Sequence, residues 1–234
     1  MFKRIGFVLL AIGLLLSMAG CQDRNTATGK YNGQKITMEY AGPTDIPYAI
    51  GLPYNRMVNG CVVFYQHILV DGQLQTPTGE DCWNALDRQG NLLFDVPYRD
   101  LTLFNEQGQA AAQKHSGEYV LVNMKGEETP LTEQAFRDFE SQMSEQYRER
   151  YGKEIVGYES QTFRGFVYNG LAPYVEKAGE DGYLLGLATA EGHMVIPAYI
   201  PVSFIPNTYR LTMHEDTIII DDNGYIGIVT ITRS

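Results

Sequence analysis

The chain has 234 residues, of which 44% are hydrophobic and 20% are charged, proportions that indicate a folded globular protein with room for one sizeable domain. This composition excludes an intrinsically disordered chain and a coiled coil. The 18 Lys and Arg against 28 Asp and Glu give a formal net charge of −10, which argues against a nucleic-acid-binding surface. The 24 Gly, 10 Pro and 16 Tyr favour turns and β-strands.

Residues 1–20 have the layout of an export signal. Lys3 and Arg4 precede an apolar stretch that runs from Ile5 to Leu16, and small residues stand just before Cys21. The apolar stretch is too short to span a bilayer comfortably, and small residues are what a signal peptidase requires before its cut. We therefore predict a signal helix that is removed from the mature protein.

The segment Ser17 to Cys21, SMAGC, resembles the lipobox of bacterial lipoproteins, with Met18 where Leu is commoner. The resemblance implies that the Cys21 thiol receives a diacylglyceryl group and that Cys21 becomes the first mature residue. Each buried methylene of an acyl chain contributes about 0.8 kcal/mol, so two or more chains, such as palmitate, give lasting anchorage to membrane lipid. The alternative is an ordinary secretory signal followed by a cysteine without a role.

The same resemblance predicts an extracytoplasmic location on a bacterial membrane. This is the outer leaflet of the cell membrane or, because Gln22 rather than Asp follows the cysteine, the outer membrane of a bacterium that has two. Residues 21–30 are small and polar, which predicts a flexible tether to a domain at 31–234. Within that domain, 35–40 is expected to form a strand that closes the edge of the first repeat.

Two further cysteines, Cys61 and Cys82, could pair. If residues 70–73 form a two-residue hairpin turn, positions whose numbers add up to the same total face each other, and these cysteines are then opposite. An oxidising compartment permits the disulfide. Pro77 and Gly79 lie in the returning arm and can break that register, so two separate buried thiols are the alternative.

A degenerate repeat runs through the body of the chain. Segments beginning at Trp83, Tyr119, Leu185 and Ile226 share a large apolar residue, two apolar positions and a small polar residue, and the first three have Gly at the eighth place. Their spacing is about 40 residues once a helical insertion is set aside. The pattern predicts a strand, a polar turn closed by Gly, and a second strand. One such hairpin cannot bury its apolar face alone, so neighbouring hairpins must stack.

These segments are similar to the WG-repeat family of bacterial proteins over about residues 58–130 and 165–234, although the naming dipeptide is replaced, for example by Trp83-Asn84 and Leu185-Gly186. The resemblance implies an all-β domain of stacked antiparallel β-hairpin or meander units, arranged as a partial propeller or a solenoid. It carries no single biochemical function. The alternative fold is a small closed barrel or sandwich in which the repeat is accidental.

One α-helix is predicted as an insertion at about 131–152. Thr132 can cap it, and its apolar stripe includes Phe139, Met143 and Tyr147. The helix either covers the β body or binds a partner. The Tyr-rich stretch that precedes the repeats adds Tyr31 and Tyr54 as candidate binding residues, with cross-strand packing as the alternative.

The sequence contains none of the common catalytic, metal-binding or cofactor-binding motifs, so we predict no catalytic residue, no metal and no cofactor. The acids at 215–216 and 221–222 could offer oxygen ligands, but Asn223-Gly224 is typical of a hairpin turn. We therefore expect a non-enzymatic binding or scaffold protein of the cell envelope that contacts a protein or a cell-wall glycan. The alternative is an envelope enzyme such as a glycan hydrolase, which needs two carboxylates about 5–9 Å apart in a cleft.

Overall fold

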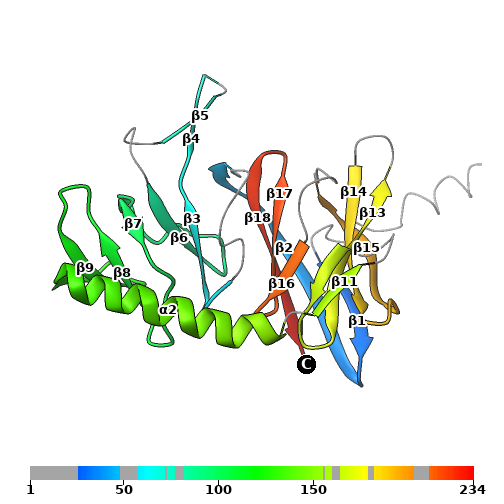
Figure 1. Ribbon diagram of the computed structural model, residues 1–234. Coiled ribbons are helices and arrows are strands. Elements are labelled where there is room, and N and C mark those ends of the chain that lie inside the picture. The colour runs from blue at the N-terminus through cyan, green and yellow to red at the C-terminus, as the bar shows by residue number, and fades with distance from the viewer. Residues whose placement is uncertain are drawn as a thin grey trace, which may run out of the picture.

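The computed structural model describes residues 26–47, 57–71, 73–76, 82–154, 156–159, 164–178, 182–202 and 211–234. Over these residues the protein is a row of β-sheets, antiparallel except for the pair of β12 and β16, with one long helix, α2 (Glu133–Glu154), lying along one side of the row (Figure 1). The all-β fold with one inserted helix is confirmed.

The sheets are built from three-stranded antiparallel units, which we number by their order along the chain. Unit 1 contains β3 (Cys61–Tyr65) and β6 (Trp83–Asp87), with residues 91–98 as an irregular third strand that is bridged at Leu86↔Leu92 and Trp83↔Tyr98. Unit 2 contains β8 (Gln109–Gln113), β9 (Tyr119–Asn123) and β10 (Glu128–Leu131), with the short β7 (Asp100–Leu101) beside β8. Unit 3 contains β13 (Leu171–Ala178), β14 (Gly182–Thr189) and β15 (Met194–Val202).

The turn after the repeat strand has the same geometry in units 1, 2 and 3. We call the polar residue that ends the repeat strand the exit residue. In each turn, the N–H of the exit residue donates to the carbonyl of the residue four positions later, and the N–H of the glycine donates to the carbonyl of the exit residue. The exit side chain accepts hydrogen bonds from the N–H groups two and four residues later. The exit residues and glycines are Asp87 and Gly90, Asn123 and Gly126, and Thr189 and Gly192, with glycine φ values of 84°, 77° and 85°. The predicted turn is therefore confirmed at all three segments.

The fourth unit is completed by the N-terminal part of the chain. Its strands β17 (Thr217–Asp222) and β18 (Tyr225–Arg233) form a hairpin, and the long β2 (Gln34–Pro47) pairs with β18 as the third strand. The prediction that this segment closes the first repeat is thus wrong. The segment forms part of β2, whose alternating buried residues pair with β18 instead. Register shifts on both sides of the pair Gly227↔Pro43 let β2 continue through the proline as one strand.

The predicted tether is corrected over residues 26–30. Strand β1 (Thr26–Tyr31) pairs with β2 through the turn Asn32-Gly33, whose φ values of 50° and 80° are those of a tight hairpin turn. Residues of β1 alternate between exposed and half-buried, so this polar segment forms a strand with one face on the protein.

The remaining strands extend this framework. The sheet of unit 4 continues into β16 (Leu211–His214), β12 (Arg164–Val167) and β11 (Val156–Glu159). The hairpin of β4 (Ile68–Val70) and β5 (Gln73–Gln75) projects away from the row on the side opposite α2 (Figure 1).

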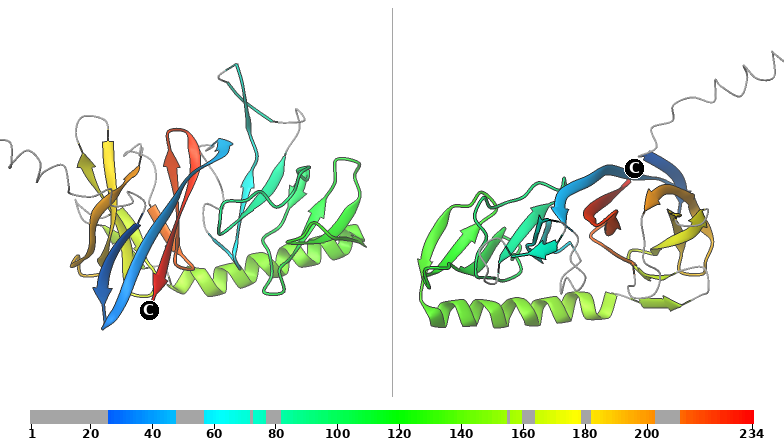
Figure 2. Two further views of the ribbon diagram at one scale, coloured as in Figure 1. Left: turned by 180° about the vertical axis from the view of Figure 1, so that it is seen from behind. Right: turned by 90° about the horizontal axis from the view of Figure 1, so that it is seen from above.

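The units stack in the order 2, 1, 4, 3, which differs from their order along the chain (Figure 2). Three hydrophobic clusters join neighbouring units: Val63 and Ala85 pack with Ala110 and Val122; Val62 and Leu86 pack with Ile226 and Ile228; Ile218 and Val229 pack with Leu185 and Ile196. Alternate residues of a strand point to opposite faces, so units 1 and 4 bury both faces. The expectation that each hairpin hides its apolar face against a neighbour is confirmed.

This order explains the helix. Unit 2 ends at one end of the stack, and after α2 the chain forms β11 and β12 of the sheet that contains unit 4 before it builds unit 3 at the other end. Stacked sheets lie about 10 Å apart, so the 22 residues of α2, which extend about 33 Å, are enough to pass unit 1 and reach this sheet. Thr132 caps the helix, since its Oγ1 accepts from the Ala135 N–H at 3.2 Å. The helix therefore carries the chain along the side of the stack.

Candidate functional site

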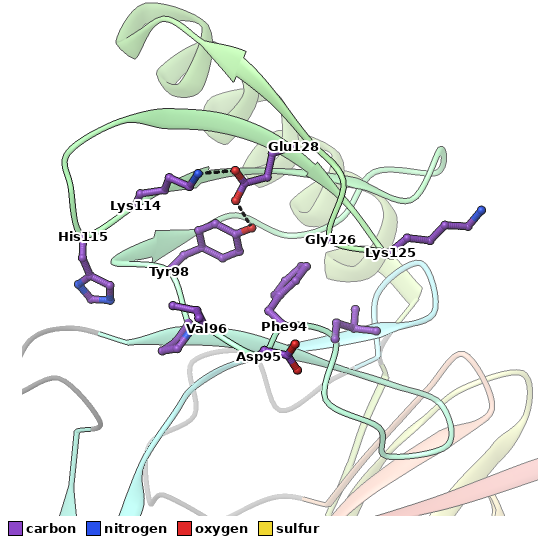
Figure 3. A pocket seen from close by; sticks show the side chains of 11 residues that line it. Phe94, Asp95, Val96, Tyr98, Lys114, His115, Lys125, Gly126 and Glu128 are labelled. Carbon is purple, nitrogen blue, oxygen red and sulfur yellow. Dashed lines mark hydrogen bonds and ion pairs between the residues drawn. The ribbon is translucent and has the colours of Figure 1, made fainter.

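A cavity of about 390 Å³ lies between the third strand of unit 1 and the turns of unit 2 (Figure 3). Residues 93–98 form one side of it. The other side consists of residues from the β8–β9 turn, the β9–β10 turn and the start of β10: Lys114, His115, Lys125, Gly126 and Glu128.

The cavity exists because the third strand of unit 1 bulges away from β6. Between the bridges Trp83↔Tyr98 and Leu86↔Leu92, the third strand has more residues than β6 does. The buried Asn84 stabilises the bulge: its Nδ2 donates to the Phe94 carbonyl at 2.8 Å and to the Gln66 Oε1 at 2.9 Å. The side chain of Val96 is consequently 70% exposed at the cavity rim.

Unit 3 contains the corresponding bulge without the cavity-forming asparagine. Its pair Leu185↔Ile200 corresponds to Trp83↔Tyr98 of unit 1, and its pair Ala188↔Met194 corresponds to Leu86↔Leu92. The pairing register of β14 and β15 shifts between these two pairs. Position 84 corresponds to Gly186, where an added Cβ would lie 2.6 Å from both the Ile196 carbonyl oxygen and the Tyr174 ring. The strand and ring that crowd Gly186 leave no space there for a side chain such as that of Asn84.

The floor of the cavity is aromatic and one wall is a hydrogen-bonded chain. The buried rings of Phe94 and Tyr98 meet edge to face at 5.1 Å between centroids. The Tyr98 hydroxyl donates to one oxygen of Glu128 at 2.9 Å, and Lys114 forms an ion pair with the other oxygen. Burial, with the bond to Glu128, raises the pKa of Tyr98, so its hydroxyl stays protonated. The hydrogen bond to Glu128 raises the pKa of Lys114, so its amine stays charged.

The charges that line the cavity cancel. Lys114 and Lys125 carry positive charge, while Asp95 and Glu128 carry negative charge, in a chain whose net charge is −10. Figure 3 places Lys114 and Glu128 facing each other on one wall and Lys125 at the far edge. The site therefore offers donors and acceptors at an apolar rim without a net charge.

The two carboxylates that line the cavity, Asp95 and Glu128, have different surroundings. Glu128 is already bound to Lys114 and Tyr98, and Asp95 is exposed. A second pair of acidic residues, Asp221 and Asp222, lies at the end of β17. The pKa of Asp221 is raised, mainly by burial. There, Asp222 accepts from the Tyr40 hydroxyl and Asp221 accepts from the Gly224 N–H at 2.8 Å. These two acids are adjacent on a strand and point to opposite faces, so they do not act as a facing pair.

Of the two alternatives for Cys61 and Cys82, the structure has the two separate buried thiols and not the disulfide. The hairpin of β4 and β5 has the register that the prediction used, with Val70 opposite Gln73. Beyond this hairpin the register changes, so that Cys61 faces Asp87, and Cys82 lies opposite Gln66. Burial is the main cause that raises the pKa of the Cys61 thiol to about 12.

Of the candidate binding residues, the three whose side chains are described belong to two different clusters. Met143 is buried and Phe139 is half-buried in the cluster between units 1 and 2, so the apolar stripe of the helix serves packing. Tyr31 packs half-buried against the cluster between units 4 and 3. Cys21 and Tyr54 lie outside the described residues, as does the side chain of Tyr147.

The cavity residues were missed by sequence reasoning. One feature of the sequence points to them: the second position of the repeat segment is Asn84 in the Trp83 segment, where the Leu185 segment has Gly186. A buried amide within a repeat strand needs a partner outside the regular ladder, and here that partner is Phe94.

No family model and no curated protein matches the chain. Among solved structures, the crystal structure of BamB from Moraxella catarrhalis matches at 13% sequence identity and a TM-score of 0.20, covering 89% of this chain and 56% of that chain. The chain thus spans a little over half the length of that protein. Within the part of the chain that the structure describes, no helix is long and apolar enough to cross a membrane.

Proposed function

We propose that this protein is a lipid-anchored, non-enzymatic binding or scaffold module of a bacterial cell envelope, and that the cavity between units 1 and 2 is its binding site. The observation that carries the proposal is the state of Glu128. Both of its oxygens are already bound, one to Lys114 and the other to Tyr98. A carboxylate held in this way is a fixed recognition group and is poorly placed to act as a nucleophile or general base.

The stack supports a binding role because it holds the site in place before a ligand arrives. The ring of Phe94, on the cavity floor, packs on Tyr98 and Phe104. The Asn84 side chain holds the bulged strand by donating a hydrogen bond to the Phe94 carbonyl. A site whose groups are already ordered loses little conformational entropy on binding. The helix has no part in this proposal, since its apolar stripe is used for packing.

The anchor rests on the segment SMAGC, in which Cys21 would carry the lipid. The test is metabolic labelling with radioactive palmitate, followed by membrane fractionation of the wild-type chain and of Cys21→Ser. We expect label and membrane association in the wild type and neither in the variant. Label that persists in the variant, or a wild-type chain released without lipid, would contradict the anchor.

The binding role is tested with the full chain in detergent, used to capture ligands from envelope extracts. Val96→Arg places a long charged side chain at the cavity rim, and because Val96 is 70% exposed the fold should tolerate it. We expect the variant to lose the specific capture that the wild type shows. Release of reducing sugar from purified cell wall, abolished in Glu128→Gln, would instead favour the hydrolase alternative.

A further inference from the structure

We infer that the cavity between units 1 and 2 recognises a neutral saccharide unit of an envelope glycan; this inference rests on the proposed function and names its ligand class. Three features of the cavity support it: its size, the ion pair of Lys114 and Glu128 on one wall, and its exposed apolar rim.

The size fits a small polar ligand or the end of a longer one. Its volume of about 390 Å³ is at the lower end of ligand sites, which enclose about 300–1,000 Å³. Val96 is one of the lining residues and is 70% exposed, so a longer ligand can continue past it into solvent.

On the polar wall, the ion pair between Lys114 and Glu128 selects against ionic ligands. An anion would have to compete with Glu128 for Lys114, and a cation would have to compete with Lys114 for Glu128. A hydroxyl group both donates and accepts, so neighbouring hydroxyls can bind the amine, the carboxylate and the Tyr98 oxygen without separating the pair. Because the pair survives, neither Lys114 nor Glu128 is left without its partner when water leaves the polar wall.

The rim supplies the apolar half of the recognition. Val96, Pro97 and Leu93 line the cavity beside the polar wall, and Val96 is the most exposed large hydrophobic residue among those described. A pyranose ring presents C–H groups on one face and hydroxyls at its edge, which matches an apolar surface beside donors and acceptors.

The site suits a peptide strand less well. Strand addition needs a row of open backbone N–H and C=O groups. On the unit 2 side, β10 contains Pro130, which has no N–H. On the unit 1 side, residues 94–97 bulge out of strand geometry between the two bridges.

The test is a titration of the full chain in detergent with the neutral trisaccharides chitotriose, cellotriose and maltotriose, followed by isothermal calorimetry and by backbone amide shifts in NMR. We expect at least one of them to bind and to shift the backbone amides of residues 93–96, 98 and 125–128. Glu128→Gln and Val96→Ser should each weaken that binding about tenfold or more, a difference of about 1.4 kcal/mol. Glu133→Gln removes the carboxylate of an exposed ion pair on the helix and should bind as the wild type does.

The outcomes separate the two proposals. If none of the saccharides binds while the wild type still captures a ligand from envelope extracts and Val96→Arg does not, the site is a binding site and the saccharide inference is wrong. If neither saccharides nor extracts give cavity-dependent binding, the proposed function fails as well. Thermal melts of each variant confirm that lost binding is not lost folding, and an equal effect of Glu133→Gln would also overturn the inference.

Discussion

Removing the Glu215 carboxylate should loosen the contact between units 1 and 4. Glu215 lies in the turn between β16 and β17, and its two oxygens accept from the N–H groups of Asn59 at 2.8 Å and Gly60 at 3.0 Å. Arg88 adds a third contact at 3.1 Å. One side chain of unit 4 thereby holds the turn that begins β3 of unit 1.

The expected loss follows from the burial of these groups. The Glu215 side chain is only 10% exposed, and hydrogen bonds to a charged group contribute about 1.5–3 kcal/mol each. Because Asn59 and Gly60 are half-buried, we take the lower figure for each bond and expect Glu215→Ala to lower the free energy of unfolding by about 3 kcal/mol. Glu215 already has a φ of +48°, and Ala at this position carries the same strain, so the difference reports the lost bonds.

The matched control is Arg88→Met. The Arg88 side chain is 45% exposed, so its ion pair with Glu215 should contribute at most about 1 kcal/mol. The assay is urea unfolding of the full chain, together with a thermal melt in which Glu215→Ala should lower Tm by about 6–12 °C. If Glu215→Ala lowers the free energy of unfolding no more than Arg88→Met does, the hydrogen bonds from the Asn59 and Gly60 N–H groups to Glu215 do not stabilise the contact between units 1 and 4.

Three further predictions concern the spacer helix, the crowded glycine and the buried thiols. Replacing residues 133–152 with six Gly and Ser residues, which span at most about 20 Å, should prevent the chain from folding, as judged by circular dichroism. A flexible segment of the original length should still allow the sheets to form. Equal folding of the two variants would refute the spacer role. Gly224→Ala has open space around its Cβ and should cost only the strain of a positive φ, about 1–2 kcal/mol. Gly186→Ala should destabilise the chain in urea by more, because strand and ring atoms lie 2.6 Å from its new Cβ, and equal losses would contradict that crowding. The raised pKa of Cys61 means that the folded state binds its proton more tightly than the unfolded state, so stability should fall as pH rises from about 9 to 12, by up to about 1.4 kcal/mol per pH unit. Cys61→Ala should remove that part of the decline between pH 9 and 10 in urea titrations, and a decline unchanged in the variant would refute the assignment.

The repeat turns could be predicted from the sequence because their chemistry is local. Asp87 and Asn123 each bond to N–H groups two and four residues ahead, and the glycine that follows takes a positive φ. These interactions lie within one short segment, so the residues that form them are read in order. The same holds for the cap at Thr132.

The stacking order could not be predicted, because it depends on contacts between segments far apart in the chain. Strand β2 pairs with β18 at the other end of the sequence, and the alternation of Ile36 and Met38 fits any neighbouring apolar face equally well. The length of α2 contained the clue. A helix of 22 residues between two repeats is far longer than a connection between adjacent hairpins requires.

The cavity was beyond sequence reasoning for a different reason. It depends on where a bulge places Val96, and on a buried asparagine that holds the bulge open. Lys114 and Glu128 come from two segments of unit 2, and Tyr98 of unit 1 joins them only when units 1 and 2 have stacked. Tyrosine content alone pointed instead to residues near the N-terminus.

The order of the units is tested most directly by methyl–methyl nuclear Overhauser contacts in the full chain labelled at Ile, Leu and Val. Contacts between Leu86 of unit 1 and Ile226 or Ile228 of unit 4 are expected, together with contacts between Val229 of unit 4 and Leu185 of unit 3. Contacts that join the methyl groups of unit 1 directly to those of unit 3, without unit 4 between them, would contradict the stack described here.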